Sequence, residues 1–129
     1  MRMAIDCHSG LLFITLKLTY LGKTGIIENV VIDTGATHSI LSPDSVRELG
    51  LEYDDEDQIV TSVGLGGRQY AFVKKVDKVE FGPFKVNGCT MDFCVIDLTG
   101  KVNGLLDLDL LSRVGTVIDL KNMLLYEGI

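Results

Sequence analysis

Hydrophobic and polar residues alternate near the start of the chain with the period of two that is typical of a half-buried β-strand. The alternation extends from Leu12 to Tyr20, and a turn with two glycines follows at residues 21–25. A second apolar run covers residues 26–32 and ends at the tripeptide Asp33-Thr34-Gly35. The pattern therefore predicts two consecutive strands, the second of which delivers an acidic residue into a turn.

Signals for short helices occur at two places in the sequence. Ser42 followed by Pro43 is typical of a helix start, and Gly50 provides a stop signal directly after Leu49. A second helical pattern covers residues 108–114 and is closed by a glycine. The sequence therefore predicts two short helices.

Further apolar runs in the middle of the chain predict hairpins. Runs at residues 59–63 and 69–81 flank the glycine-rich segment 64–67, which indicates a hairpin with a glycine tip. Residues 84–98 predict a further hairpin or strand pair, with Asn87-Gly88 as its strongest turn signal.

Two closing strands are predicted at residues 116–120 and 123–126. The chain therefore contains many short strands and two helical pieces, without the regular alternation of strand and helix that builds a parallel sheet. This organisation predicts a mostly β fold, either a small closed barrel or a sandwich.

The amino-acid composition indicates a globular protein and argues against two classes of partner. With 129 residues, 47% hydrophobic and 23% charged, the chain is expected to form a single globular domain over residues 1–129. Its net charge is −6, and the longest run of basic residues is Lys74-Lys75, so nucleic acid is not expected as a partner. The apolar runs are far shorter than a membrane span, and no membrane partner is expected.

The number of cysteines indicates the redox conditions of the cellular compartment in which the chain is expected. Cys7, Cys89 and Cys94 are an odd number in a chain that is large enough to fold without disulfides. The N-terminus has one basic residue before Asp6 and lacks the pattern of a secretory signal, so we expect a reducing cytoplasm. The cysteines lack zinc-ligand spacing and are interpreted as buried structural thiols, with neither metal nor cofactor expected.

Other polar segments have ordinary interpretations. The acidic residues at 52–57 lack the ligand spacing of a calcium loop and are expected to form a solvated loop. The segment after the glycines at 64–67 is strand-like, which argues against a phosphate-binding loop. His8 and His38-Ser39 lack a nucleophile elbow and are expected to be structural or exposed.

The sharpest chemical feature is the acidic residue of Asp33-Thr34-Gly35, which emerges from an apolar strand. Taken alone, the tripeptide is a weak signal, because an Asx-turn at the end of a strand has the same local sequence.

Four segments in the same order resemble the retropepsin-like family of aspartic proteases over about residues 11–126. They are the apolar strand into Asp33-Thr34-Gly35-Ala36, the continuation Ile40-Leu41-Ser42, the glycine-tipped hairpin at 64–67 and the late segment 103–111. The resemblance implies a small closed barrel of the acid-protease type that hydrolyses peptide bonds in peptide or protein substrates. It also implies that Asp33 is catalytic.

The resemblance further implies a homodimer. Hydrolysis of this type uses two carboxyl groups that share a proton, and the chain has one such motif. Asp33 of two copies would then meet at a two-fold axis, with Thr34, Gly35 and Ala36 supporting the turn and the dimer contact. Ala36 offers the carboxyl pair no side-chain donor.

The same resemblance assigns the hairpin tip as a flap over the substrate. The flap residues would be Gly64, Leu65, Gly66 and Gly67.

One position departs from the family. The apolar pair Leu105-Leu106 is followed by Asp107, where the family usually has glycine. Glycine at such a position typically permits a positive φ or close backbone packing, so Asp107 is expected to be strained if φ is positive and unremarkable if it is exposed. An alternative function therefore stays open: a dimeric peptide-binding or interaction module with the same fold and little or no proteolysis.

Overall fold

The computed structural model describes residues 2–35, 38–64 and 67–129, and most of them lie in strands. In chain order the elements are β1 (Arg2–Ala4), β2 (Asp6–His8), β3 (Leu11–Tyr20), β4 (Lys23–Ile32), β5 (Ile40–Leu41), α1 (Pro43–Val46), the 3₁₀ turn η1 (Arg47–Leu49), β6 (Ile59–Gly64), β7 (Gly67–Phe81), β8 (Phe84–Phe93), β9 (Gly104–Leu106), α2 (Leu108–Leu111), β10 (Thr116–Asp119) and β11 (Leu124–Glu127).

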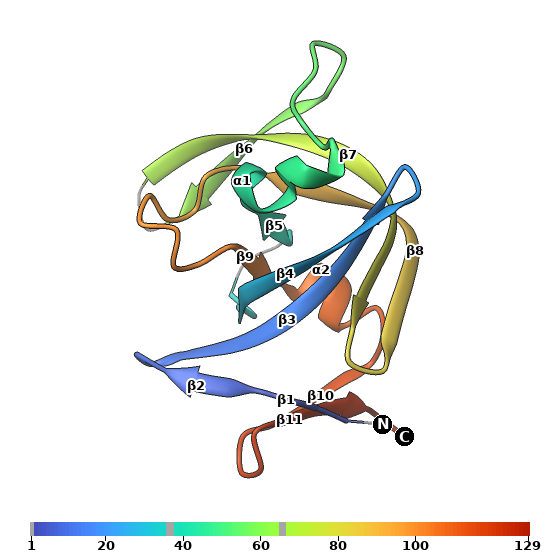
Figure 1. Cartoon of the computed structure of the whole chain (residues 1–129). Coiled ribbons are helices and arrows are strands. Elements are labelled where there is room, and N and C mark those ends of the chain that lie inside the picture. The colour runs from blue at the N-terminus through green and yellow to red at the C-terminus, as the bar shows by residue number, and fades with distance from the viewer. Residues whose placement is uncertain (1, 36–37, 65–66) are drawn as a thin grey trace.

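The larger sheet closes on itself. Its strand order is β2-β3-β4-β9-β5-β8-β7-β6, and an additional antiparallel pairing of β3 with β7 joins the two sides into a ring (Figure 1). In that pairing Leu18 lies opposite Val79, and both side chains are fully buried. The prediction of a mostly β, small closed barrel is confirmed.

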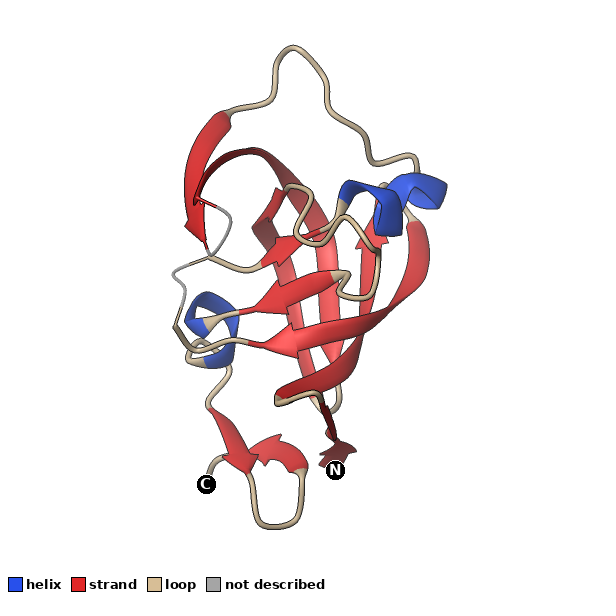
Figure 2. Ribbon diagram, turned by 90° about the vertical axis from the view of Figure 1, so that its left-hand side faces the viewer, coloured by secondary structure: helices blue, strands red, loops and turns tan. Residues whose placement is uncertain are grey.

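A smaller sheet contains both ends of the described chain. Its order is β1-β11-β10, with Met3 opposite Leu125 and Ile118 also opposite Leu125. Figures 1 and 2 show the two termini at the same end of the molecule, and the acidic loop at residues 52–57 projects from the opposite end. The predicted closing strands are therefore confirmed, and β1 is an element that the sequence pattern did not indicate.

Three central strands position the candidate site. β9 runs parallel to β4, with Ile32 opposite Leu106, and antiparallel to β5, with Leu41 opposite Gly104. A Cβ atom at Gly104 would lie 2.6 Å from Cδ2 of Leu41 and 3.1 Å from the carbonyl oxygen of Ile40. Only glycine lets these strands approach so closely, because real Cβ atoms do not tolerate contacts of that length.

The barrel encloses one large apolar cluster. Its largest fully buried side chains come from strands of the ring, from α1, from the segment after η1 and from the smaller sheet. They are Leu16, Leu18, Ile27, Val30, Leu41, Val46, Leu51, Phe81, Met91, Phe93, Leu106 and Leu125. The alternation that predicts β3 is confirmed, since Leu16 and Leu18 point into this core while Lys17 is exposed.

The structure corrects the prediction for residues 84–98. Asn87-Gly88 lies inside the single strand β8, and the turn is made by Gly82-Pro83, which joins Phe81 to its partner Phe84. Gly82 has a φ of +57°, as a tight hairpin requires. Gly88 also has a positive φ, at +60°, so the Asn-Gly signal marks a local irregularity and the strand continues past it.

Both predicted helices are present but short. The first ends as α-helix at Val46 and continues as a 3₁₀ turn to Leu49, with Gly50 at a φ of +76° as its left-handed cap. The second covers only Leu108–Leu111. In the described part of the chain, no helix is long and apolar enough to cross a membrane.

The acidic loop and the cysteines also differ in part from expectation. Asp57 is not a solvated residue of the loop, because its carboxylate pairs with the ammonium group of Lys74 at 2.9 Å and both side chains are largely buried. Cys89 and Cys94 are buried as predicted, whereas Cys7 is exposed. His8 is exposed, and its ring stacks on Phe13 with a centroid distance of 4.1 Å.

Candidate active site

Asp33 lies directly after β4, where the parallel pair β4 and β9 ends. Its backbone amide donates to the carbonyl oxygen of Leu106 at 2.9 Å, which extends the parallel ladder by one hydrogen bond. The side chain is half-buried, whereas Thr34 and Gly35 are exposed. Ala36 lies outside the described residues. The turn therefore fixes the backbone of an acidic residue and leaves its carboxyl group accessible from one side.

The turn itself holds the Asp33 carboxylate. The amide of Gly35 donates to Oδ1 of Asp33 at 2.9 Å, which forms an Asx-turn, the ordinary local structure that this tripeptide also allows. A Cβ atom at residue 35 would lie 3.3 Å from that same oxygen, so any side chain there would crowd the carboxylate. Gly35 thus permits the approach that orients Asp33.

A second set of contacts fastens the chain that leads into β5. Ser39 is 1% exposed, its amide donates to Oδ2 of Asp109 at 2.9 Å, and its hydroxyl donates to Oδ1 at 2.6 Å. The hydroxyl oxygen also accepts from the amide of Asp107 at 2.9 Å. Because these residues are about 70 positions apart in the sequence, the contacts fix the segment before β5 to the start of α2.

Asp107 is neither strained nor exposed, which corrects both expectations for this position. Its φ is −111° and its ψ is −177°, an extended conformation open to any residue, and the residue is 0% exposed. Within the described residues, neither carboxyl oxygen has a hydrogen-bond partner. Burial, together with the negative charges of Asp33 and Asp109, raises the pKa of the Asp107 carboxyl to about 7.

The β6–β7 hairpin lies on the same side of the molecule as α2 (Figure 2). Its strands are paired from Ile59 opposite Phe72 to Gly64 opposite Gly67, so the predicted hairpin is present. Two of the four predicted flap residues, Leu65 and Gly66, lie outside the described residues.

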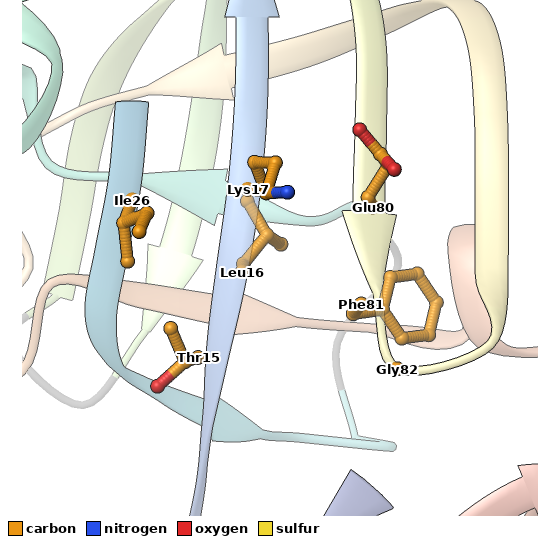
Figure 3. Close-up of a pocket in the computed structure, with 7 residues that line it drawn as sticks. All are labelled: Thr15, Leu16, Lys17, Ile26, Glu80, Phe81 and Gly82. Atoms are coloured by element: carbon orange, nitrogen blue, oxygen red, sulfur yellow. The ribbon is translucent and has the colours of Figure 1, made fainter. Parts of the chain in front are cut away.

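A shallow pocket elsewhere on the barrel is not part of this site. It lies between β3, β4 and the end of β7, and Figure 3 shows its lining side chains. These are Thr15, Leu16, Lys17, Ile26, Glu80, Phe81 and Gly82. None of them belongs to the turn at Asp33 or to the paired part of the β6–β7 hairpin, residues 59–72.

Comparison with known proteins identifies the family. A family model described as aspartyl protease matches residues 17–110, which contain the turn at Asp33, the hairpin and the Ser39–Asp109 contacts. The chain belongs to the aspartyl protease family. No curated protein sequence matches it significantly.

The fold of this aspartyl protease family member has a solved counterpart. A crystal structure of a retropepsin-like aspartic protease from Rickettsia conorii aligns with a TM-score of 0.67 and 21% sequence identity. The alignment covers 97% of this chain and 86% of that one. The architecture is therefore the retropepsin-like one that the sequence motifs predict.

Sequence reasoning missed the residues that support the turn. Nothing in the local sequence around Ser39 indicates its bond to Asp109, and nothing around Gly104 indicates how closely its strand approaches Leu41. The signal available for Asp109 was its place in the first turn of a predicted helix, where an acidic residue is usually interpreted as favourable to the helix dipole.

Proposed function

We propose that the chain is an aspartic endopeptidase whose active site forms between two identical copies. The observation that carries the proposal is the placement of Asp33, which is half-exposed, oriented by the Gly35 amide and anchored to Leu106. Each copy supplies one such carboxyl group, and the reaction of this family needs two.

The chemistry follows from two carboxyl groups that share one proton. The ionised Asp33 removes a proton from water, whose oxygen bonds to the carbonyl carbon of the peptide, while the protonated Asp33 of the other copy gives its proton to the carbonyl oxygen. When the tetrahedral adduct breaks down, the protonated carboxyl of the pair gives its proton to the leaving nitrogen, the other carboxylate takes a proton from one hydroxyl of the adduct, and the C–N bond breaks. The products are a carboxylic acid and an amine, and the pair again holds one shared proton.

The neighbouring residues have supporting roles in this proposal. Thr34 is exposed in the free chain and is available for a hydrogen bond across the two-fold axis. Gly35 and Ala36 are assigned to the support of the turn and to the dimer contact, as the resemblance to the family implies. The hairpin ending at Gly64 and Gly67, with Leu65 and Gly66 between them, covers the bound peptide.

The direct test is cleavage by an Asp33→Asn variant. The amide keeps the shape of the side chain but cannot exchange the proton, so we expect at least a roughly hundredfold loss of peptide cleavage with the fold retained. Asp55→Asn is the matched control, because Asp55 is exposed in the acidic loop. Cleavage is followed by mass spectrometry on a mixed peptide library from pH 4 to 8. An Asn variant within about tenfold of wild type contradicts the assignment.

Sedimentation over a range of protein concentrations tests the shared site. Specific activity should rise with the fraction of dimer, because a single copy supplies one carboxyl group. Full activity at concentrations where the chain is monomeric contradicts the shared site.

A second candidate function is a dimeric module that binds peptides without cleaving them. The buried carboxyl of Asp107 favours it, because the family that cleaves peptides usually has glycine at this position and no further acidic group beside the paired carboxyls. Peptide binding that persists in wild type without any product between pH 4 and 8 would support this candidate.

A further inference from the structure

Strand β7 changes its pairing partner at Phe72. This residue lies opposite Ile59 of β6 and also opposite Phe93 of β8, and β7 pairs with β6 before it and with β8 after it. The chain enters the β6–β7 hairpin from the acidic loop, residues 52–57, and leaves it along β7. The position of the hairpin relative to the barrel therefore depends on what holds these two connections.

One face of β7 at the base of the hairpin packs on β5. Successive side chains of a strand point to opposite faces, so Ala71 and Gln69 share this face. Ala71 is 1% exposed and packs with Ile40 of β5 and with Cys94, whose thiol donates to Oε1 of Gln69 at 3.2 Å. Since Ile40 lies in the segment that follows the turn at Asp33, this face connects the hairpin to the candidate site.

The opposite face of β7 holds the acidic loop through Phe72 and Lys74. The ammonium group of Lys74 pairs with the carboxylate of Asp57 at 2.9 Å, and the two side chains are 11% and 12% exposed. The ring of Phe72 meets the ring of Tyr53 edge to face, with the centroids 5.7 Å apart. Since Tyr53 and Asp57 belong to the acidic loop, two side chains of β7 fasten that loop to the base of the hairpin.

The ion pair spans the open end of the hairpin. Ile59 and Phe72 are the last register partners of β6 and β7, and Asp57 and Lys74 stand two positions farther along each segment. The carboxylate of Asp57 also accepts from the amide of Asp54 at 2.9 Å, which fixes the loop around it. The pair thus acts as one more cross-strand contact beyond the end of the β6–β7 ladder.

Both partners of this pair carry their charges. Burial acts to raise the pKa of Asp57, but the bonds from Lys74 and from the Asp54 amide outweigh it and hold that pKa below its ordinary value. Burial acts to lower the pKa of Lys74, and the pairing with Asp57 outweighs it, so that pKa lies above its ordinary value. Removing one partner would leave a largely buried charge without compensation, which is strongly destabilising at the place where it occurs.

We propose that the Lys74–Asp57 ion pair positions the β6–β7 hairpin for peptide binding, by fastening the acidic loop to the base of β7. The inference rests on the proposed function, in which the hairpin covers the bound peptide, and deepens it by assigning two positioning residues. Neither residue belongs to the turn at Asp33, so both act through the hairpin and not on the reacting atoms.

The direct test is amide hydrogen exchange at Val73, whose amide donates to the carbonyl oxygen of Gln58 at 3.0 Å beside the ion pair. In Asp57→Asn this exchange should be at least about tenfold faster, because opening the hairpin base no longer breaks a charge pair, whereas exchange in β3 should stay slow. Asp55→Asn is the matched control, since it removes an exposed charge from the same loop. Unchanged exchange at Val73 in the folded Asp57→Asn variant overturns the inference.

Lys74→Met tests the other partner and serves as the second variant should Asp57→Asn fail to fold. If the two side chains act as a pair, exchange at Val73 in the double variant should be no faster than in the faster single variant. Additive effects would mean that Asp57 and Lys74 act separately, and would overturn the assignment of a pair.

Peptide cleavage supplies an independent readout. Asp57→Asn should raise KM for a peptide that wild type cleaves by about tenfold and leave kcat within about threefold, because the hairpin loses position while Asp33 is unchanged. A merely structural role would lower the folded fraction, and with it kcat, without moving KM. If exchange at Val73 accelerates but no peptide is cleaved by wild type, the proposed function fails and the anchoring of the hairpin stands. If cleavage occurs with the same KM in both proteins, the inference alone fails.

Discussion

Replacing the buried carboxyl of Asp107 by an amide should change how stability depends on pH. In the folded chain the pKa of Asp107 is about 7, against an ordinary value of 3.8. Between these two pH values the folded state holds a proton that the unfolded chain has released. Stability therefore falls as the pH rises through this window, and it is constant above the folded pKa.

The size of the loss follows from the same two pKa values. A difference of about three pH units, at about 1.4 kcal/mol per unit, gives at most about 4 kcal/mol lost between pH 4 and pH 8. Since typical domains are stable by only about 5–15 kcal/mol, a loss of this size dominates the pH dependence. Asp107→Asn should abolish that part of the slope, apart from a constant offset for the buried amide.

Urea unfolding at fixed protein concentration measures the effect. The chain has no tryptophan, so far-ultraviolet circular dichroism is the suitable signal. The free energy of unfolding of Asp107→Asn, relative to wild type, should grow by several kcal/mol from pH 4 to pH 8, and Asp55→Asn should follow wild type. If the Asp107→Asn and wild-type curves stay parallel over this range, Asp107 is not a buried titrating group and the reasoning is refuted.

Three further substitutions test the proposed dimer contact, the packing of the central strands and the bond between Ser39 and Asp109. Thr34→Ala should weaken dimerisation before it lowers activity per dimer, by about 1 kcal/mol for each lost hydrogen bond, and sedimentation equilibrium measures this directly. Gly104→Ala should destabilise the fold by about 1–3 kcal/mol, because its Cβ would meet Leu41 at 2.6 Å; a thermal midpoint equal to wild type would show that the strands can separate freely. Ser39→Ala removes the 2.6 Å bond to Asp109, so urea unfolding should reveal a loss of about 1–3 kcal/mol, whereas an unchanged midpoint would mean that the contact is dispensable.

The features that the sequence predicts well are those with local signals. β3 follows from its alternation, and the turn at Asp33 follows from an apolar run that ends in Asp-Thr-Gly. The β6–β7 hairpin is also predicted from a local signal, because two strand-like runs flank the glycines of its turn. Each of these patterns lies within one continuous stretch of the sequence, where propensity and periodicity are informative.

The features that the amino-acid sequence does not predict depend on contacts between distant segments of the chain. Ser39 meets Asp109 across 70 positions, and neither residue carries a local sign of the other. Asp107 stands out only by comparison with the family, and its burial results from the way β9 lies between β4 and β5. At Asn87-Gly88 a strong local turn signal is overridden, because the pairing of β7 with β8 continues on both sides of it.

The pairing of the first strand with the last has a consequence for how the chain folds during synthesis. Arg2 lies opposite Tyr126, so β1 cannot pair with β11 until the ribosome has released the chain as far as Tyr126. The ring likewise joins β4 to β9, two strands more than 70 positions apart. Contacts at such separation are slow to form, and the smaller sheet cannot be completed before residues 124–127 have been synthesised, so β1 is an unpaired edge until then. A chain shortened before β11 should therefore keep β1 unpaired and be prone to aggregation.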